Sequence, residues 1–286
     1  MALSEAARAA VERATGAKVK AVRGLGGGCV ADVRLVELEG GLRVVAKVPQ
    51  GTDDLSLEAW MLDYLRATSR LPVPRVLHAD ADLLVMEYLE SGDPIDETAE
   101  RHAAELLAAL HAIGAPEYGL ERNTLIGGLP QPNAQSRSWV SFFRDRRLLF
   151  MAGEARAAGR LPARLHDRIE RFADAIGEFL EEPERPGLIH GDMWGGNVLV
   201  KRGRIAGFID PAIYYADPEI ELAFSTLFST FGAAFFARYA ELRPIRPGFF
   251  ETRRDVYNLY PLLVHVRLFG GGYAGAVERT LDRFGY

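Results

Sequence analysis

Three oxygen-bearing side chains between positions 188 and 211 have the types and spacing that phosphoryl transfer requires. Asp192 and Asn197 lie five positions apart in the segment HGDMWGGN, and Asp210 follows after two apolar runs joined by a glycine turn. Phosphoryl transfer needs a carboxylate that orients or deprotonates the attacking hydroxyl, and oxygen ligands that hold Mg²⁺ against a triphosphate. We therefore expect Asp192 to act as the base and Asn197 and Asp210 to hold the metal.

A surface turn is the alternative interpretation of this segment, because Gly, Asp and Asn are common in turns. A turn would explain the glycines, but not the apolar runs on both sides or the second aspartate at the end of a hairpin. His190, two positions before the expected base, is interpreted as structural: its ring would pack beneath the loop and hold the loop backbone.

A second group of residues near the N-terminus fits the phosphates of a nucleotide. A glycine cluster between two β-rich runs would let backbone amides approach phosphates closely. Lys47 ends the apolar run VVAKV, and Glu58 on the next helix could pair with it and fix its rotamer. Each signal alone is weak, since a hairpin turn, a solvated lysine and a surface glutamate are common. The glycines expected to cover the phosphates are Gly26, Gly27 and Gly28.

The segment LLVMEYLESGD has the form of a buried strand that runs into a linker. The backbone of Glu87 and Leu89 at this strand edge is expected to hold adenine. An ordinary strand and linker fits the same residues, and both interpretations can hold together. The sequence contains no GxxxxGK[ST] motif, which disfavours a P-loop nucleotide-binding protein.

The elements that must position these residues divide the chain into a β-rich part and a helical part. Periodicity and turn residues predict helices for the longer amphipathic runs and strands for the β-rich ones. We expect an α+β fold with two lobes: residues 1–92 as a small antiparallel β-rich nucleotide-binding lobe, and 93–286 as a larger helical lobe for catalysis and acceptor binding. The expected helices are 3–14, 54–68, 98–113, 163–181, 219–242, 249–269 and 273–283; the expected strands are 19–22, 30–38, 42–48, 76–78, 83–89, 198–200 and 205–209.

Composition limits the partners and the compartment. The chain has 286 residues and a formal net charge of −5, so no basic face is expected for nucleic acid. We expect no membrane segment, no signal peptide and a cytoplasmic protein. The single cysteine, Cys29, excludes an internal disulfide. Its thiol beside the glycine cluster could be oxidised or bridge to a second molecule, although a small buried apolar role is the more common state.

With these residues in view, the chain resembles the fructosamine (ketosamine) kinase family, relatives of aminoglycoside and choline kinases. HGDMWGGN is similar to the family's HGDLWSGN, and the segment 118–148 is similar to the family's insert with its IG, Q-x-N, W-x-x-F and R-L elements. The segment DPAIYYADPEIELAF and the C-terminal LFGGGY also fit. The resemblance covers about Val22 to Tyr273.

The resemblance implies a protein-kinase-like fold and a kinase that transfers the γ-phosphate of ATP, with Mg²⁺, to O3 of a ketosamine such as fructosamine or ribulosamine. Such an enzyme would take part in protein deglycation. Trp194 would offer a flat face to the sugar, and carboxylates nearby could meet the ammonium group. The residues assigned to the acceptor in this way are Trp194, Asp217, Glu219 and His265, with Glu221 beside them.

Two other functions remain open at this stage. An aminoglycoside or choline-type small-molecule phosphotransferase would have a differently lined acceptor pocket, and the insert 118–148 argues against it. A nucleotide-binding pseudokinase is disfavoured because Lys47, Asp192, Asn197 and Asp210 are all present. Departures from the family pattern, such as Val264 before His265, leave the preferred ketosamine undecided. We expect a monomer or a weak homodimer that binds a small-molecule or protein-bound acceptor.

Overall fold

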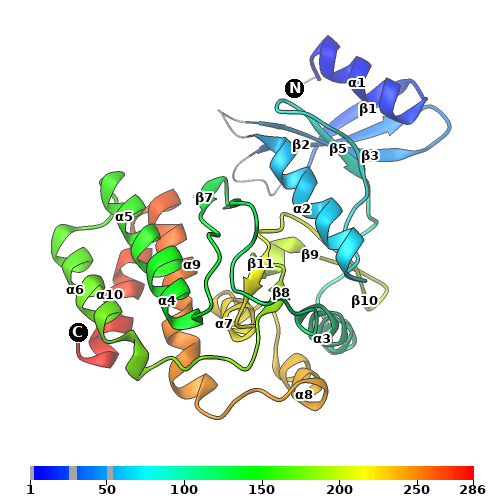
Figure 1. The fold of residues 1–286 in the computed structure, drawn as a ribbon. Helices are drawn as coiled ribbons and strands as arrows, with labels where there is room; N and C mark the ends of the chain where they lie inside the picture. The colour runs from blue at the N-terminus through cyan, green and yellow to red at the C-terminus, as the bar shows by residue number, and fades with distance from the viewer. Residues whose placement is uncertain (1–2, 26–30, 50–53) are drawn as a thin grey trace. The chain divides into compact units, whose positions relative to one another are not determined.

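The computed structural model describes residues 3–25, 31–49 and 54–286. Gly26, Gly27, Gly28 and Cys29 lie outside the described residues, so the expectations for the glycine cover and the thiol are not addressed by the structure. The chain forms two compact units: Met1–His102 with Gly196–Pro211, and Ala103–Gly195 with Ala212–Tyr286. Figure 1 labels the elements of each unit.

The first unit is built on a five-stranded antiparallel sheet with the order β1-β2-β3-β5-β4. The predicted Gly-Gly hairpin is present between the second and third strands, where Gly40 and Gly41 have φ of 84° and 87°, a region that glycine adopts without steric cost. The strands are β1 (Val19–Gly24), β2 (Ala31–Leu38), β3 (Arg43–Pro49), β4 (Val76–Ala79) and β5 (Leu84–Glu87).

Strand β3 shows why one apolar run can carry a charged side chain. Successive side chains of a strand point to opposite faces. Val44 and Ala46 belong to the apolar cluster under α1 (Glu5–Thr15), whereas Lys47 pairs with a residue of α2 (Leu55–Thr68). The two helices therefore cover opposite faces of the sheet, as Figure 1 shows.

The hairpin of β9 (Val198–Lys201) and β10 (Arg204–Phe208) belongs to the first compact unit, although residues 103–195 of the second unit lie between it and the rest of the first unit in the sequence. The amides of Gly92 and Asp93 donate to the carbonyl oxygen of Val200, and the amide of Phe208 donates to that of Pro72 at 2.8 Å. Because of these bonds the compact units differ from the expected lobes 1–92 and 93–286. The roles assigned to those lobes stay a prediction.

The second unit is mainly helical and has two short two-stranded antiparallel sheets, one between segments that lie far apart in the chain and one in a tight turn. Figure 1 shows α9 and α10 beside α5 and α6. Helix α3 (Glu97–His111) runs from the first unit into the second. The other elements are α4 (Trp139–Phe143), α5 (Phe150–Ala157), α6 (Ala163–Asp174), α7 (Glu219–Leu227), α8 (Ala233–Leu242), α9 (Arg254–Phe269), α10 (Gly272–Phe284), β6 (Thr124–Ile126), β7 (Leu129–Gln131), β8 (Gly187–Ile189) and β11 (Tyr214–Ala216).

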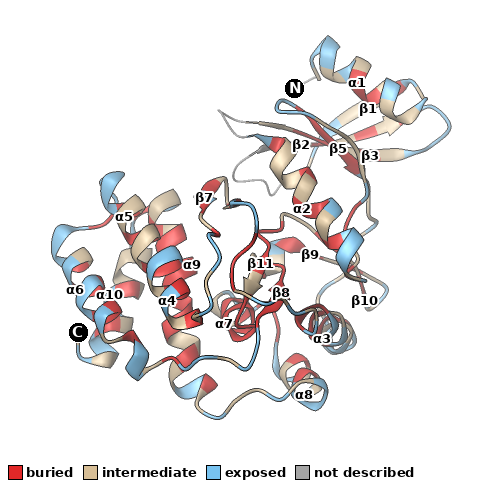
Figure 2. Cartoon of the chain, in the orientation of Figure 1, coloured by how far each residue is buried: buried red, intermediate tan, exposed pale blue. Residues whose placement is uncertain are grey.

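The core of the second unit is rich in aromatic rings. Trp139 is fully buried, stacks on Phe142 and donates through its indole N–H to the hydroxyl of Tyr257 at 2.9 Å. Figure 2 shows α7 and β8 buried along most of their length. Among the described residues there is no helix that is both long and apolar enough to cross a membrane.

The sequence predicted most helices and the strands of the first unit, but it missed the four short strands β6, β7, β8 and β11 and differed from the structure in three helical regions. The expected helix 219–242 is two helices, broken around Ser229, whose φ is 53°. The expected helix 163–181 ends at Asp174 and is followed by a 3₁₀ turn. The helical run 139–157, which includes a π-helical turn at 144–149, was not predicted.

Candidate active site

Lys47 is the centre of a charged cluster in the first unit. Its side chain is buried, 5% exposed, and its ammonium donates to Glu58 of α2 at 2.6 Å and also to Asp210, the residue expected to bind metal. Glu58 lies in the first turn of α2, where Asp54 caps the helix by accepting from the amide of Ser56. The structure thus brings together three residues that the sequence predicted, from a strand, a helix and the end of a hairpin.

The cluster keeps Lys47 protonated. Burial acts to lower the pKa of Lys47, but the negative charges of Glu58 and Asp210 outweigh it and raise the pKa above its ordinary value. A buried ammonium that holds its proton is a fixed positive charge. It suits the α- and β-phosphates of a nucleotide, where a point charge on a lysine is a common phosphate ligand.

Asn197 and Asp210 flank the β9–β10 hairpin. The amide of Ile209 donates to the backbone oxygen of Asn197 at 3.1 Å, so the two candidate metal ligands are held at neighbouring ends of one hairpin. Asp210 has a φ of 55°, a left-handed conformation that is uncommon for a residue with a side chain. Carboxylate and amide oxygens are the donors that Mg²⁺ and Ca²⁺ prefer, so this donor set fits a hard divalent cation.

The two residues expected at the adenine lie where β5 leaves the sheet. Glu87 is exposed and ends the strand, with its amide donating to the carbonyl oxygen of Arg75 at 2.9 Å. Leu89 packs closely against Gly207 of β10: a Cβ added to Gly207 would lie 2.3 Å from Cδ1 of Leu89. This packing fixes the linker against the hairpin that carries Asp210.

The loop with the expected base, Asp192, belongs to the second unit. His190 is fully buried, and its Nδ1 accepts a hydrogen bond from the backbone N–H of Asp192 at 3.4 Å. This contact is consistent with a structural role for the histidine. Gly191 has a φ of 87°, and a Cβ there would lie 2.0 Å from the carbonyl oxygen of Ala212. Only glycine fits this position, so the loop backbone can approach the chain segment before β11.

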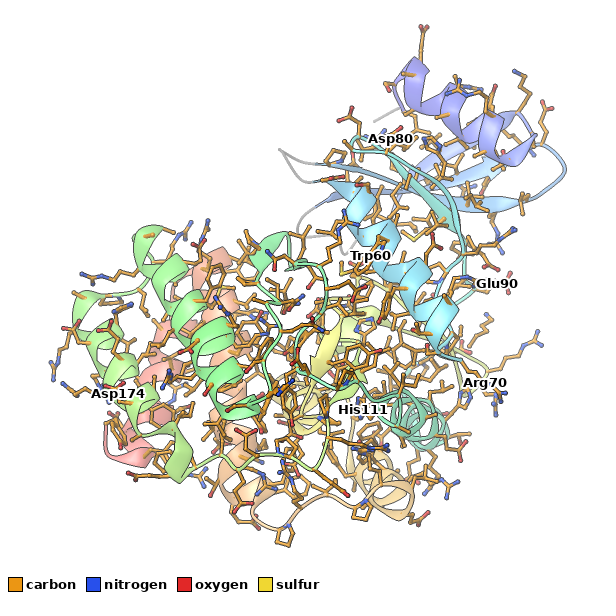
Figure 3. All side chains as sticks on the ribbon, viewed as in Figure 1. Trp60, Arg70, Asp80, Glu90, His111 and Asp174 are labelled. Carbon is orange, nitrogen blue, oxygen red and sulfur yellow. The ribbon has the colours of Figure 1, made fainter. Side chains whose placement is uncertain are left out.

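A buried acid holds the loop from below. Glu221 of α7 accepts the amide of Gly191 at 2.6 Å and pairs with Nε2 of His111 at 2.8 Å. The other ring nitrogen of His111 bonds the hydroxyl of Tyr239 at 2.7 Å. His111, labelled in Figure 3, is the last residue of α3. Glu221 was expected near the acceptor; in the structure one of its oxygens accepts from the loop backbone and the other pairs with His111.

The insert 118–148 supplies further support to the segment that faces this loop. The side-chain nitrogen Nε2 of Gln131 donates to the carbonyl oxygen of Ala212 at 3.0 Å, and the side-chain oxygen Oε1 accepts from the hydroxyl of Tyr260 at 2.7 Å. Asn133 accepts from the guanidinium of the buried Arg147 at 2.6 Å. The insert therefore fixes Ala212, the residue on which Gly191 rests. In the sequence, the Q-x-N spacing of Gln131 and Asn133 was the feature that could have indicated this supporting role.

Asp217 and Glu219 lie in a buried ionic network. Asp217 accepts from the hydroxyl of Tyr257 at 2.7 Å and from Arg246. Glu219 accepts from Arg253 at 2.6 and 3.0 Å and from Arg246 at 3.1 Å. Both carboxylates are almost fully buried and bound by guanidinium groups. This geometry disfavours the expected contact with a substrate ammonium, because each carboxylate would have to leave a cationic partner.

Trp194 and His265 are brought into one aromatic row, although 71 residues separate them in sequence. The ring of Trp194 lies 6.4 Å from Phe228, and Phe228 lies 4.9 Å from His265. His265 donates from Nδ1 to the carbonyl oxygen of Pro261 at 2.7 Å. Burial lowers the pKa of His265 and favours the neutral ring.

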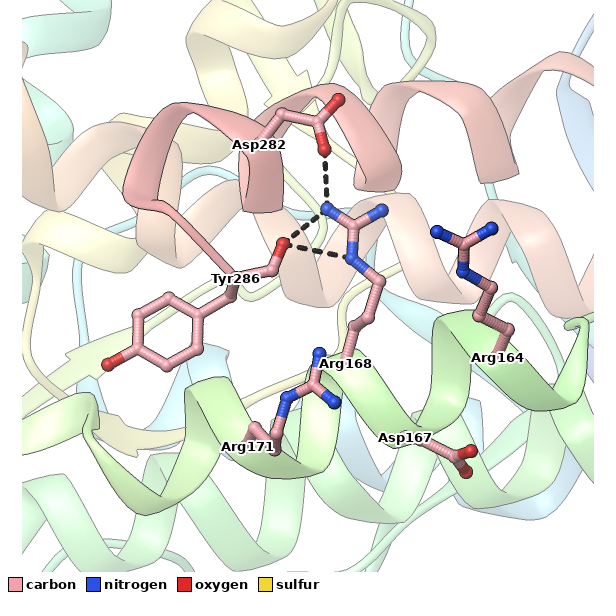
Figure 4. Close-up of a pocket in the computed structure, with 6 residues that line it drawn as sticks. All are labelled: Arg164, Asp167, Arg168, Arg171, Asp282 and Tyr286. Atoms are coloured by element: carbon pink, nitrogen blue, oxygen red, sulfur yellow. Dashed lines mark hydrogen bonds and ion pairs between the residues drawn. The ribbon is translucent and has the colours of Figure 1, made fainter.

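A pocket of about 490 Å³ lies elsewhere on the second unit, between α6 and the end of α10 (Figure 4). Its central guanidinium, Arg168, donates to Asp282 at 2.5 Å and to the backbone oxygen of Tyr286. None of the residues predicted for the site lines it, so it is not the candidate active site. The lining residues are Arg164, Asp167, Arg168, Arg171, Asp282 and Tyr286.

Known structures place the fold among the protein-kinase-like phosphotransferases. A thermostable mutant of an aminoglycoside phosphotransferase, solved with ADP and hygromycin B, matches with a TM-score of 0.68 over 96% of each chain at 17% identity. At that identity the likeness shows the fold alone. It confirms the predicted α+β kinase-like fold class.

The chain belongs to the fructosamine kinase family, whose model matches residues 3–284. A Synechocystis protein named as a probable ketoamine kinase is 33% identical over 274 residues, covering 93% of this chain and 90% of that protein. A solved structure assigned as a fructosamine-3-kinase from Thermobifida fusca has a TM-score of 0.86 and 31% identity over 98% of both chains. The resemblance seen in the motifs is thus confirmed.

Proposed function

We propose that the protein is an ATP-dependent kinase that phosphorylates a sugar hydroxyl, O3, of a ketosamine such as fructosamine or ribulosamine. Family membership supports the reaction class. The single structural observation that carries the proposal is the buried Lys47, held between Glu58 and Asp210. A lysine fixed by a helix carboxylate beside a metal-binding aspartate is the arrangement that protein kinases use for ATP.

Each residue has a defined task in this proposal. Lys47 binds the α- and β-phosphates, and the backbone of Glu87 and Leu89 meets adenine. Asn197 and Asp210 would hold Mg²⁺, which neutralises charge on the phosphates when bound. Asp192 orients the acceptor hydroxyl and accepts its proton as the oxygen attacks the γ-phosphate. Phosphoester formation then releases ADP as the leaving group.

The acceptor side of the proposal rests on Trp194 and His265. Trp194 lies two positions after Asp192, which suits a flat surface beside the reacting sugar. A neutral His265 with Nδ1 bound to Pro261 presents Nε2 as a hydrogen-bond acceptor. We propose that these rings, rather than Asp217 and Glu219, meet the sugar and its amine. A cytoplasmic enzyme acting in deglycation would be consistent with this chemistry.

ADP release with a panel of acceptors tests the proposal. We expect Mg²⁺-dependent turnover with ribulosamine, erythrulosamine or fructosamine derivatives, and none with kanamycin or choline. Asp192→Ala should abolish turnover and retain nucleotide binding, measured by calorimetry. Turnover with kanamycin or choline alone would assign the protein to the other phosphotransferases of this fold. Full turnover in the Asp192 variant would refute that residue as the base.

A further inference from the structure

The aromatic row extends beyond the two rings assigned to the sugar. His265 of α9 is its centre: Phe228, Phe269 and Tyr273 all place their rings within 5.7 Å of the imidazole, centre to centre. Phe269 and Tyr273 also contact each other at 6.2 Å. We call Phe228, Phe269 and Tyr273 the outer rings. They come from three different helices or helix ends.

Two glycines after α9 make this convergence possible. Gly270 and Gly271 have φ of 65° and 61°, so the chain turns sharply and α10 begins at once. The turn returns Tyr273 to His265, while Phe269 lies one helical turn after His265 on α9. The LFGGGY segment that helped to identify the family is thus the turn that closes the row.

Two of the outer rings, Phe228 and Phe269, are unusually open for aromatic side chains, whereas Tyr273 is partly buried. Phe228 is 37% exposed and Phe269 is 47% exposed, and they are two of the five large apolar residues exposed in the described part of the chain. Clustered exposed apolar side chains mark ligand or protein contacts more often than isolated ones do. Their continuity with Trp194 through Phe228 connects them to the proposed acceptor side.

The chemistry of the acceptor says what would reach these rings. In a ketosamine, C1, C2 and C3 of the sugar connect the amine nitrogen to O3, so the nitrogen lies close to the reacting hydroxyl. The amine's other substituent must leave the site from there. Aromatic faces attract a cation and cover apolar groups, and the Nε2 atom of a neutral His265 can accept a hydrogen bond from the ammonium. No carboxylate is required.

We propose that the outer rings bind the substituent on the amine nitrogen, and that the enzyme therefore prefers ketosamines of apolar or aromatic amines. This inference rests on the proposed function, since it concerns the same acceptor. The occupant is the amine-side group of the substrate. Burying an apolar group against such rings lowers its free energy in proportion to the area removed from water.

The test is kcat/KM for fructose adducts of methylamine, butylamine and benzylamine, with ATP and Mg²⁺ saturating. Wild type should prefer the benzylamine adduct over the methylamine adduct by about tenfold, the factor expected for partial burial of one ring. Phe228→Leu and Phe269→Ala should each reduce this ratio to about twofold. Both positions are exposed at the surface, so the variants should keep the wild-type melting temperature.

Phe250→Ala is the matched control. Phe250 is 42% exposed on the same unit and contacts Phe236 and Phe249 rather than the row. It should keep the tenfold ratio. Equal kcat/KM for all adducts in wild type, or an unchanged ratio in both row variants, would overturn the inference and leave the kinase assignment intact. If no adduct is phosphorylated, the proposed function fails first.

A second copy of the chain could cover the outer rings instead of the substrate, and sedimentation of the same variants distinguishes these two possibilities. Concentration-dependent association of wild type that Phe269→Ala abolishes, together with a flat adduct series, would assign the outer rings to a contact between copies of the chain and overturn the substrate role. A monomer at all concentrations with the tenfold preference supports it.

Discussion

The charged cluster of the first unit and the acceptor side of the second unit use acidic residues in opposite ways. In the first, Glu58 and Asp210 surround one buried ammonium that is itself proposed to meet the ligand. In the second, Asp217 and Glu219 are neutralised by Arg246 and by other partners within the protein. An acidic residue near a site is therefore not evidence for a cationic ligand until its partners are known.

The largest effect on activity is expected from a substitution of Lys47, the cation of the first unit's charged cluster. Lys47→Met removes the positive charge proposed for the phosphates and should lower kcat by about 10²- to 10³-fold, the loss seen when one electrostatic contact to a developing charge is deleted. Steady-state ADP release measures it. Loss of the buried charge partner should also destabilise the first unit, because it leaves Glu58 unpaired.

Arg34→Met is the control for that instability. Arg34 is a buried cation on the neighbouring strand, paired with Asp32, and its register partner Ala46 belongs to the α1 face of the sheet. It should lower stability while kcat changes less than twofold. Similar activity losses in both variants would show that instability, not the lost charge, explains the effect at Lys47.

Next in size is the support of the catalytic loop. Glu221→Gln keeps the shape but weakens the bonds to Gly191 and His111, each of which involves a charged acceptor worth about 1.5–3 kcal/mol. We expect kcat to fall about tenfold with little change in the KM for ATP, and a lower urea midpoint. An unchanged kcat with a lower midpoint would restrict Glu221 to stability alone.

The pH dependence of stability should distinguish this variant from wild type. Burial tends to raise the pKa of Glu221, but the bonds from His111 and Gly191 outweigh it and lower the pKa below 4.5. A lowered folded pKa gives stability that is present above pH about 4.5 and is lost as pH falls through the folded value. The stability difference between wild type and Glu221→Gln should therefore shrink in acid. A constant difference would contradict the assignment.

A smaller effect is expected at Asp217. Asp217→Asn should reduce the free energy of unfolding by about 1–3 kcal/mol, because Arg246 and Tyr257 lose a charged partner. The KM for a ketosamine should remain within twofold of wild type. A tenfold rise in that KM without loss of stability would return Asp217 to the acceptor and remove the contrast between the two units.

The smallest effect concerns the pocket of Figure 4. Arg164→Ala should leave kcat/KM unchanged and shift stability by less than about 0.5 kcal/mol, as for most surface substitutions. A loss of activity there would show that this pocket communicates with the site.

The sequence could predict the features that depend on neighbouring residues in the chain, but not those that depend on distant partners. Lys47 was readable because alternation along one strand sets its face, and Glu58 because it opens the next helix. The oxygens around one hairpin were readable for the same reason: Asn197 precedes β9 and Asp210 follows β10. Local periodicity and turn chemistry decide such positions.

The remaining features depend on partners far away in the chain. Glu221 could not be assigned to the loop of Gly191 without knowing how α7 packs, and His111 comes from 110 residues earlier. Arg246 and Arg253 gave no signal in sequence that they neutralise Glu219. Charged residues paired across such separations have the same local pattern as solvated ones, so propensity cannot tell them apart.

Because Gly191 contacts Ala212 so closely, a substitution at position 191 should displace the loop that carries Asp192. Any β-carbon there would occupy space that a backbone oxygen already fills, 2.0 Å away. Gly191→Ala must push two chain segments apart while the residues proposed for ATP, which belong to the other compact unit, keep their own packing. The Gly191→Ala variant should still bind nucleotide but hold Asp192 in the wrong position. It would therefore differ from Asp192→Ala, which lacks the carboxylate altogether.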